Sequence, residues 1–237
     1  MRIKLHFSIY RTKNKYLPTN FNSIITDDIE IKRTQSIKYI GVIIDVSLNW
    51  KDHVQYVMQN CVKYFGTFNS IKHYISKKLA RQLYFAFVSS RIKYGIEVYG
   101  SCSNNLLSKL QTLQNKLLKL LLRLPFRHST NKLHQDLGIL KVNDMYNYAL
   151  LNFTYQCIAK ACPPVLTNYF SVRDIEPSLR QHEYLNIHRY RTTFGASCVR
   201  NRAARLWNDL SHDVVSISDF NLFKKHINGL YLTKYTD

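Results

Sequence analysis

The pattern of apolar and polar positions changes character early in this 237-residue chain. In the N-terminal part, apolar side chains alternate with polar ones, which is the period of a half-buried strand. Residues 3–10 alternate in this way, 23–25 and 29–32 flank a short acidic turn, and 37–45 form a β-branched and aromatic run that contains Gly41. We therefore expect a strand, a β-hairpin and a further strand, which together predict a small antiparallel sheet.

From Asn49 onward, apolar side chains recur at three- and four-residue steps, which predicts amphipathic helices. Asn49 is the expected N-cap of the first helix, with Asp52 three residues later as in a weak capping box. Ser76 is expected to open the second helix, and Pro125 to end the third, because proline interrupts a helix. The predicted helices are 49–75, 76–93, 104–124, 129–138, 143–160, 197–210 and 219–232.

These elements predict an α+β fold, with a small antiparallel β-sheet or hairpin at the N-terminus and a mainly α-helical region after it. We expect four segments along the chain: strands at 1–46, helices at 47–125, further helices at 126–170, and a C-terminal segment with two helices at 171–237. A sheet strand that begins at the first residue needs neighbouring strands, and few candidates follow it. This pattern indicates a fragment of a longer protein.

Charge narrows the classes of partner. The chain carries 34 Lys and Arg side chains against 15 Asp and Glu, which gives a formal net charge of +19. Most of this excess lies in residues 1–170. Such a surplus favours a polyanionic partner, nucleic acid first and a membrane surface second. The alternatives are a protein from a lineage with basic residue usage, or one half of an assembly whose acidic half is a separate chain.

Cysteine usage and the N-terminus indicate an intracellular protein, in the nucleus or the cytoplasm. The five cysteines are scattered and odd in number, unlike a disulfide framework. The first residues lack the uninterrupted apolar core of a signal peptide. No apolar run reaches the length of a membrane span, so we expect no membrane partner. The cysteines are Cys61, Cys102, Cys157, Cys162 and Cys198.

An acidic pair, Asp27-Asp28, stands at the tip of the predicted hairpin. Two aspartates on such a turn can hold the metal ions of nucleotidyl transfer, but that chemistry needs a third carboxylate upstream. No Asp or Glu precedes Asp27, so we interpret the pair as an acidic turn. No phosphate-binding loop and no nucleophile motif occurs elsewhere. The sequence therefore predicts no catalytic residue in this chain.

Two cysteines and two histidines form a weak candidate for a zinc site. Cys157 and Cys162 are followed by His182 and His188. The spacing of the cysteines fits poorly with the tight pairs of structural zinc sites, and Cys162 adjoins two prolines. The alternative is a set of core cysteines and surface histidines, and we predict no metal ligand here.

The basic faces of the helices at 49–75 and 76–93 are the stronger functional signal. Tyrosines alternate with the basic side chains there, at Tyr56, Tyr64, Tyr74, Tyr84 and Tyr94. Phosphate contacts from Lys and Arg beside stacking rings are a general means of holding a nucleic-acid strand. The alternative is a solvated amphipathic face with half-buried tyrosines. The predicted nucleic-acid-binding residues are Lys51, Lys63, Lys72, Lys77, Lys78, Arg81, Arg91 and Lys93.

Four blocks of motif residues follow one another along the chain. The first is Lys38-Tyr39-Ile40-Gly41-Val42 with Asp45, Leu48, Trp50 and His53. The second is Leu83-Tyr84 with Arg91-Ile92-Lys93-Tyr94-Gly95 and Val98-Tyr99-Gly100, and the third is Leu110 with Gln114-Asn115-Lys116. The fourth is Arg191-Thr192-Thr193-Phe194-Gly195 with Leu206-Trp207-Asn208-Asp209-Leu210 and Phe220, Phe223, Lys224 and Lys225. In this order the blocks resemble the reverse transcriptases of non-LTR, LINE-type retrotransposons.

The resemblance implies a C-terminal fragment of an RNA-directed DNA polymerase: the end of the palm, the thumb and the post-thumb region. It implies that Tyr39, Ile40, Gly41 and Val42 form a primer-grip-like turn and that 47–125 is thumb-like. The implied partners are an RNA template, a DNA primer, their hybrid, and the palm and fingers of the full-length polymerase. Mg²⁺ is expected for the intact enzyme, whereas this chain lacks the palm carboxylates and is expected to need no cofactor and to be inactive alone.

Some positions depart from the family pattern. Ile40 stands where the family has Leu, Tyr99 where it has Trp, and Ser211-His212 where Leu-Pro is usual. Two rival interpretations remain open. One is a non-enzymatic basic helical module that binds RNA or a protein partner, and the other is a decayed remnant of a mobile element without function.

Overall fold

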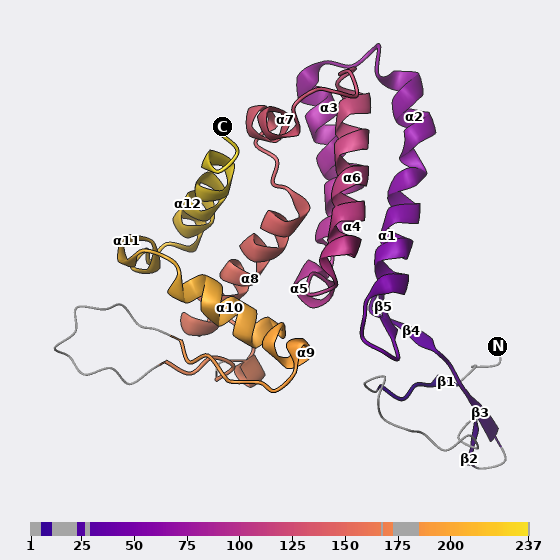
Figure 1. Ribbon diagram of the computed structural model, residues 1–237, viewed down its shortest axis with the longest axis vertical. Helices are drawn as coiled ribbons and strands as arrows, with labels where there is room; N and C mark the ends of the chain where they lie inside the picture. The colour runs from indigo at the N-terminus through magenta and orange to yellow at the C-terminus, as the bar shows by residue number, and fades with distance from the viewer. Residues whose placement is uncertain (1–5, 11–22, 27–28, 167, 173–184, 237) are drawn as a thin grey trace.

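A computed structural model of the chain describes residues 6–10, 23–26, 29–166, 168–172 and 185–236. Strands occupy the N-terminal part and helices the remainder, so the predicted α+β class is confirmed (Figure 1). Strands β1–β5 lie at the lower end of α1, and the C-terminal helices lie beyond α8, on the side away from α1 (Figure 1).

The first three strands form one sheet in the order β1-β3-β2. β2 (Ser23–Thr26) and β3 (Ile29–Arg33) are antiparallel, which confirms the predicted hairpin. The acidic pair predicted at its tip lies outside the described residues. β1 (His6–Phe7) pairs parallel to β3, a feature that alternation alone does not predict.

The next two strands correct the prediction of a single strand at 37–45. β4 (Ser36–Tyr39) and β5 (Val42–Asp45) form a separate antiparallel hairpin. Ile40 and Gly41 connect them with positive φ angles of 44° and 80°. Two residues with positive φ make the tight turn that matches the twist of paired strands, so the chain reverses here rather than running straight.

The first helical stretch runs through α1 (Lys51–Val62) and α2 (Tyr64–Ile71), as the apolar spacing predicts. Its predicted cap is wrong, because the N-cap position is Trp50, with φ 64°, rather than Asn49. The Asn49 side chain nevertheless accepts from the Lys51 N–H at 2.9 Å. The Asp45 carboxylate accepts hydrogen bonds from the backbone N–H groups of Ser47, Asn49 and Trp50, just before the helix, at 3.1, 3.2 and 2.8 Å. These contacts join β5 to the start of α1.

The second helical stretch is continuous but changes its winding. It passes from α3 (Lys77–Leu83) into a π-helical turn, η1 (Tyr84–Ser89), and then into α4 (Ser90–Lys93). The Ser76 hydroxyl accepts from the Leu79 N–H at 3.2 Å, which confirms the predicted cap. π-Turns inside helices are frequent at functional sites.

The remaining helices complete a bundle around α6 and α8 (Figure 1). α5 (Ile96–Tyr99) and α6 (Asn104–Leu121) follow α4, and α7 (Thr130–Leu137) and α8 (Val142–Ile158) come next. A short 3₁₀ turn, η2, then covers Pro164–Leu166. The C-terminal helices are α9 (Thr193–Ala196), α10 (Val199–Asn208), α11 (His212–Val215) and α12 (Phe220–Thr233).

A buried hydrogen bond between the side chains of Gln114 and Tyr84 joins α6 to η1 in the core. Gln114 donates from Nε2 to the Tyr84 hydroxyl at 2.7 Å and to the Leu140 carbonyl at 2.9 Å. All three residues are buried, and burial is favourable for such groups only when they are hydrogen-bonded. α6 therefore serves as the central support for the helices that carry most of the predicted basic residues. No helix among the described residues is long and apolar enough to cross a membrane.

Candidate nucleic-acid interface

The turn at residues 39–42 is anchored to the end of α4. The Tyr94 hydroxyl donates a 2.6 Å hydrogen bond to the carbonyl oxygen of Ile40. A Cβ atom on Gly41 would lie 2.9 Å from Cε1 of Tyr94, and one on Gly95 would lie 2.9 Å from a Val42 methyl. Both glycines also have positive φ, which side chains disfavour. The first two motif blocks of the sequence therefore meet here, with glycine on each side of the contact.

Two large side chains project from this anchored turn. Tyr39 is 63% exposed and Ile40 is 70% exposed. An exposed ring and an exposed aliphatic chain on a fixed two-residue turn form a small, rigid apolar tip. Such a tip is suited to contact a second molecule, since its backbone is already ordered before binding.

His53 closes the space under the turn. Its Nδ1 accepts a hydrogen bond from the Ile43 N–H at 3.2 Å, and its ring packs edge-on against Tyr99 at 4.7 Å. Burial, with the nearby Lys38 charge as a second cause, lowers the pKa of His53 below its ordinary value. The imidazole is therefore held neutral, and its Nε2 carries the proton because Nδ1 is the acceptor.

A hollow of about 230 Å³ opens between the turn and α1. Side chains of Arg91 and Tyr94 line one side, and Tyr56 and Asn60 of α1 line the other. Lys38 Nζ, on β4, donates to the Tyr56 hydroxyl at 3.0 Å, and this contact lowers the pKa of Tyr56. Arg91 and two tyrosines thus line one concave surface beside the exposed tip, and Lys38 contacts one of these tyrosines.

The predicted basic residues divide into two groups along the helices. Arg91 lines the hollow, whereas Lys93 lines a different hollow with Glu97 and Tyr148, and its ammonium lies 5.7 Å from the Phe85 ring centre. Desolvation lowers the pKa of Lys93 below its ordinary value. Lys63 extends the group along α1, where its ammonium donates to the Asn60 side chain at 3.1 Å. The turn itself joins β4 and β5, and these basic residues lie on or beside α1 and α4.

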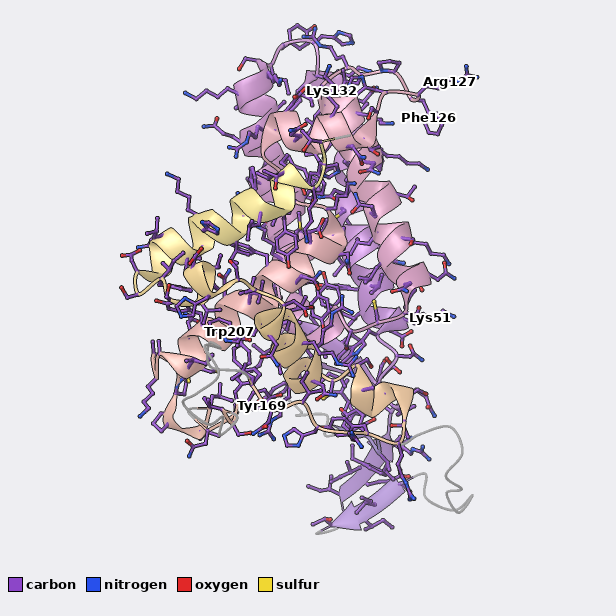
Figure 2. The ribbon with its side chains drawn as sticks, turned by 60° about the vertical axis from the view of Figure 1, so that its left-hand side comes forward. Lys51, Phe126, Arg127, Lys132, Tyr169 and Trp207 are labelled. Carbon is purple, nitrogen blue, oxygen red and sulfur yellow. The ribbon has the colours of Figure 1, made fainter. Side chains whose placement is uncertain are left out.

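The other predicted residues lie elsewhere. Lys51 stands at the start of α1, towards the lower end of the helices in Figure 2, beside a hollow that Lys109 also lines. Lys72, Lys77 and Lys78 lie around the connection between α2 and α3, at the other end. Arg81 has a structural contact, because its Nε donates to the Leu137 carbonyl at 2.6 Å. The role of all eight residues in nucleic-acid binding stays a prediction.

The tyrosines predicted to stack on bases have different environments. Tyr56 and Tyr94 line the hollow, and Tyr74 is 88% exposed beyond the end of α2. Tyr84 is fully buried in the core, which excludes it from contact with a ligand. Tyr64 packs against Phe68 and Phe87. Sequence spacing places all of them on helices but does not separate the surface from the core.

Three residues of this interface were not predicted as site residues from the sequence: Lys38, His53 and Asp45. Each belongs to the first motif block, so a signal was present. The roles of Lys38 and His53 follow from contacts between the hairpin and α1, whereas Asp45 contacts backbone N–H groups two to five residues later. The interpretation of 37–45 as one strand concealed the roles of Lys38 and His53.

The described residues contain no group of three or more His, Cys, Asp and Glu side chains that could hold a metal ion. The described residues therefore do not fit the Mg²⁺ of a polymerase site. Of the zinc candidates, His182 lies outside the described residues, and His188 is exposed. Burial, aided by a hydrogen bond with Cys162, raises the pKa of the Cys157 thiol to about 12.

Comparison with known proteins bears on identity. The chain is 26% identical over 117 residues to an RNA-directed DNA polymerase from the mobile element jockey of Drosophila funebris. It is 24% identical over 129 residues to a probable RNA-directed DNA polymerase from transposon X-element of Drosophila melanogaster. The chain is a relative of the non-LTR retrotransposon reverse transcriptases. The resemblance stated from the motif blocks is thereby confirmed.

The similarity to these reverse transcriptases is partial. The matches cover 48% and 52% of this chain but only 13% and 14% of the two relatives. The matched region of each reverse transcriptase is therefore about one seventh of its length. No family model matches the chain, and no solved structure matches it.

Proposed function

We propose that the chain grips the duplex of RNA template and DNA primer as the thumb-side part of a non-LTR retrotransposon polymerase. The observation that carries this proposal is the anchored turn, in which Tyr94 fixes the Ile40 carbonyl while Tyr39 and Ile40 remain exposed. Lys38 and Arg91 lie beside it, on β4 and α4. The relatives are named as RNA-directed DNA polymerases, which supports a nucleic-acid partner.

The proposed grip acts on the backbone of the duplex. The turn at 39–42 supports the primer strand, and Lys38 and Arg91 contact phosphates near it. Lys63 extends these contacts along α1. Contacts of this kind read charge and duplex shape rather than base sequence. The grip therefore positions a primer end without choosing its sequence.

The chemistry of nucleotide addition belongs to the palm. Mg²⁺ bound by palm carboxylates supplies the Lewis acid for that chemistry in the intact enzyme. Since the described residues do not fit this ion, we derive no catalytic step from them. This chain is expected to bind a template–primer duplex and to extend no primer when tested alone.

The test is the affinity of the full chain for a blunt RNA–DNA hybrid, measured over a range of salt concentrations. Phosphate contacts release counterions, so the logarithm of affinity should fall linearly with the logarithm of salt. In a Lys38→Gln, Arg91→Gln double variant, the slope should shrink by about two, because each lost contact contributes roughly 0.9. An Arg205→Gln, Lys225→Gln variant is the matched control, since both side chains are exposed on the C-terminal helices.

Two results would overturn the proposal. One is absence of measurable affinity at about 100 mM salt, where a protein with several phosphate contacts still binds. The other is an equal slope in the double variant and the control. A flat salt slope combined with tight binding to a protein would favour the helical module that binds protein.

A further inference from the structure

A phenylalanine stands exposed at the end of the helices remote from the 39–42 turn. Phe126 is 81% exposed, in the loop that joins α6 to α7. Figure 2 shows Phe126 and Arg127 projecting outward at the upper end of the helices, with Lys132 close by. The ring lies among basic side chains, so this surface presents an apolar ring and positive charge together.

The loop that carries Phe126 is held in shape by backbone contacts. Lys119 Nζ donates to the Phe126 carbonyl at 2.6 Å, and the His128 N–H donates to the Pro125 carbonyl at 3.0 Å. The Leu124 N–H also donates to the Lys119 carbonyl at 2.9 Å. The ring is therefore presented by an ordered loop, and a ligand that contacts it does not have to order the loop first.

A hollow of about 210 Å³ adjoins the same loop. Its floor is apolar and includes Leu121, Leu133 and Leu137. Lys77, Arg123 and His128 stand around it, with Asp136 as an acid among them. A concave apolar surface with a few polar groups at its edge is the usual form of a site for a flat organic ring.

The charge around Phe126 is mainly positive. Arg123, Arg127 and Lys132 are exposed, and the Lys119 ammonium lies 5.6 Å from the Phe126 ring centre. A polyanion that also carries flat apolar rings matches both features of this surface. Single-stranded nucleic acid has that chemistry, because its unpaired bases can stack on aromatic side chains while its phosphates meet Lys and Arg.

We propose that the loop at 122–129 and its hollow bind a single-stranded polynucleotide. One base stacks on Phe126, a neighbouring base enters the hollow over Leu133, and Arg123, Arg127 and Lys132 contact the intervening phosphates. A duplex does not meet these requirements, because its bases are already paired and stacked. The expected ligand is therefore an unpaired strand, RNA or DNA, since every base has a face on which to stack.

This site is separate from the template–primer grip. The helical stretch from Ser76 to Lys93 connects the two regions and spans roughly 25 Å at 1.5 Å per residue. In Figure 1 the α2–α3 connection and α7 lie at one end of the helices, and β4, β5 and α5 lie at the other. Variants at one end should leave binding at the other unchanged.

The test uses the full chain and a labelled single-stranded 12-nucleotide RNA, with a DNA strand of equal length as a second arm. Phe126→Ala should weaken binding of both strands roughly tenfold or more, the size of one lost base–aromatic stack. Phe194→Ala is the matched control, an exposed phenylalanine on α9, and should bind normally. Arg127→Gln with Lys132→Gln should reduce the salt slope by about 1.4, at roughly 0.7 per contact with a single strand.

A fluorescence measurement tests the stacking itself. Both native tryptophans, Trp50 and Trp207, are buried, so the Phe126→Trp variant adds one exposed reporter. Its emission should be quenched when the strand binds, and its affinity should match that of the unmodified chain. Affinity for a blunt RNA–DNA hybrid should be unchanged in Phe126→Ala, which separates this proposal from the template–primer grip.

Three outcomes would overturn the proposal. They are equal affinity of Phe126→Ala and Phe194→Ala for the single strands, absence of quenching in the Phe126→Trp variant, and displacement of the RNA by polyglutamate at equal charge concentration. The last result would mean that charge alone holds the strand.

Discussion

The Tyr94 hydroxyl and the Ile40 carbonyl oxygen lie 2.6 Å apart and are joined by a hydrogen bond that spans 54 residues of sequence. This contact fixes the tip of the β4–β5 hairpin against the end of the second helical stretch. It joins two motif blocks that lie far apart in the sequence. The hairpin is therefore part of the helical body rather than a loose extension of it.

Replacing Tyr94 with Phe removes this hydrogen bond and keeps the ring. We expect the free energy of unfolding to fall by about 1 kcal/mol or less, since the contact is partly exposed. The backbone amides of the hairpin, Val42 among them, should exchange hydrogen faster. Tyr74→Phe is the control, because Tyr74 is 88% exposed and should tolerate the change. Equal exchange rates in the two variants would contradict the anchoring role of Tyr94.

Asp45 connects β5 to α1 by accepting three backbone N–H groups. Asp45→Asn removes the charge and one acceptor oxygen from this buried position, so we expect a loss of about 2 kcal/mol of stability in urea denaturation. Asp209→Asn, at an exposed aspartate, should change stability by no more than about 0.5 kcal/mol. A similar, small effect at both positions would show that the Asp45 contacts do not organise the start of α1.

His134 makes the stability of the helical region depend on pH. Its ring is buried, and burial lowers its pKa from the ordinary 6.5 to about 4. The unfolded chain therefore binds a proton between these two values that the folded chain does not, and stability rises with pH through this window. The contribution is complete above pH 6.5 and is lost progressively as the pH falls towards 4. It amounts to about 3 kcal/mol.

The measurement is urea denaturation of the unmodified chain and of His134→Gln at several pH values from 7 to 4. His134→Gln should be less stable at pH 7, because the hydrogen bonds to the Ile139 carbonyl and Asn115 change, but should lose less stability on acidification. His226→Gln, at an exposed site, should follow the unmodified chain. Parallel pH profiles for all three proteins would exclude His134 as the source of the dependence.

Much of the fold follows from residue patterns. Apolar side chains at three- and four-residue steps predict the long helices because burial of one face is what stabilises them, and α1, α6, α8, α10 and α12 all appear where the pattern indicates. The hairpin of β2 and β3 follows from its two alternating runs. The long helices and this hairpin depend on residues that are close together in the sequence, so the pattern of apolar and polar residues is enough to predict them.

The features that a pattern does not contain are those set by distant contacts. The run at 37–45 has the composition of one strand, yet it reverses at Ile40 and Gly41, and the tip of the turn is held by Tyr94, 54 residues later. The Asp45 carboxylate, by contrast, makes local contacts, to backbone N–H groups two to five residues later. Tyr84 and Tyr94 look alike in the sequence, and only packing against α6 buries the first.

The candidate site was predicted in part. The turn at Tyr39–Val42 was identified from its motif, and Arg91 from its basic helix. Lys38 and His53 were missed as site residues, since their roles depend on β4 and β5 lying side by side over α1. Arg81 was predicted to bind nucleic acid, and its hydrogen bond to the Leu137 carbonyl gives it a structural role as well.

The most direct test of the template–primer grip is the affinity of the Gly41→Ala chain for a blunt RNA–DNA hybrid. The added Cβ would lie 2.9 Å from the Tyr94 ring at a residue with φ of 80°, so the turn or the Tyr94 ring that anchors it must shift. Gly66→Ala is the matched control, because the helix there leaves open space for a methyl group. The account predicts weaker hybrid binding by Gly41→Ala, with the helices still folded, and normal binding by Gly66→Ala. Equal affinity of the two variants would contradict it.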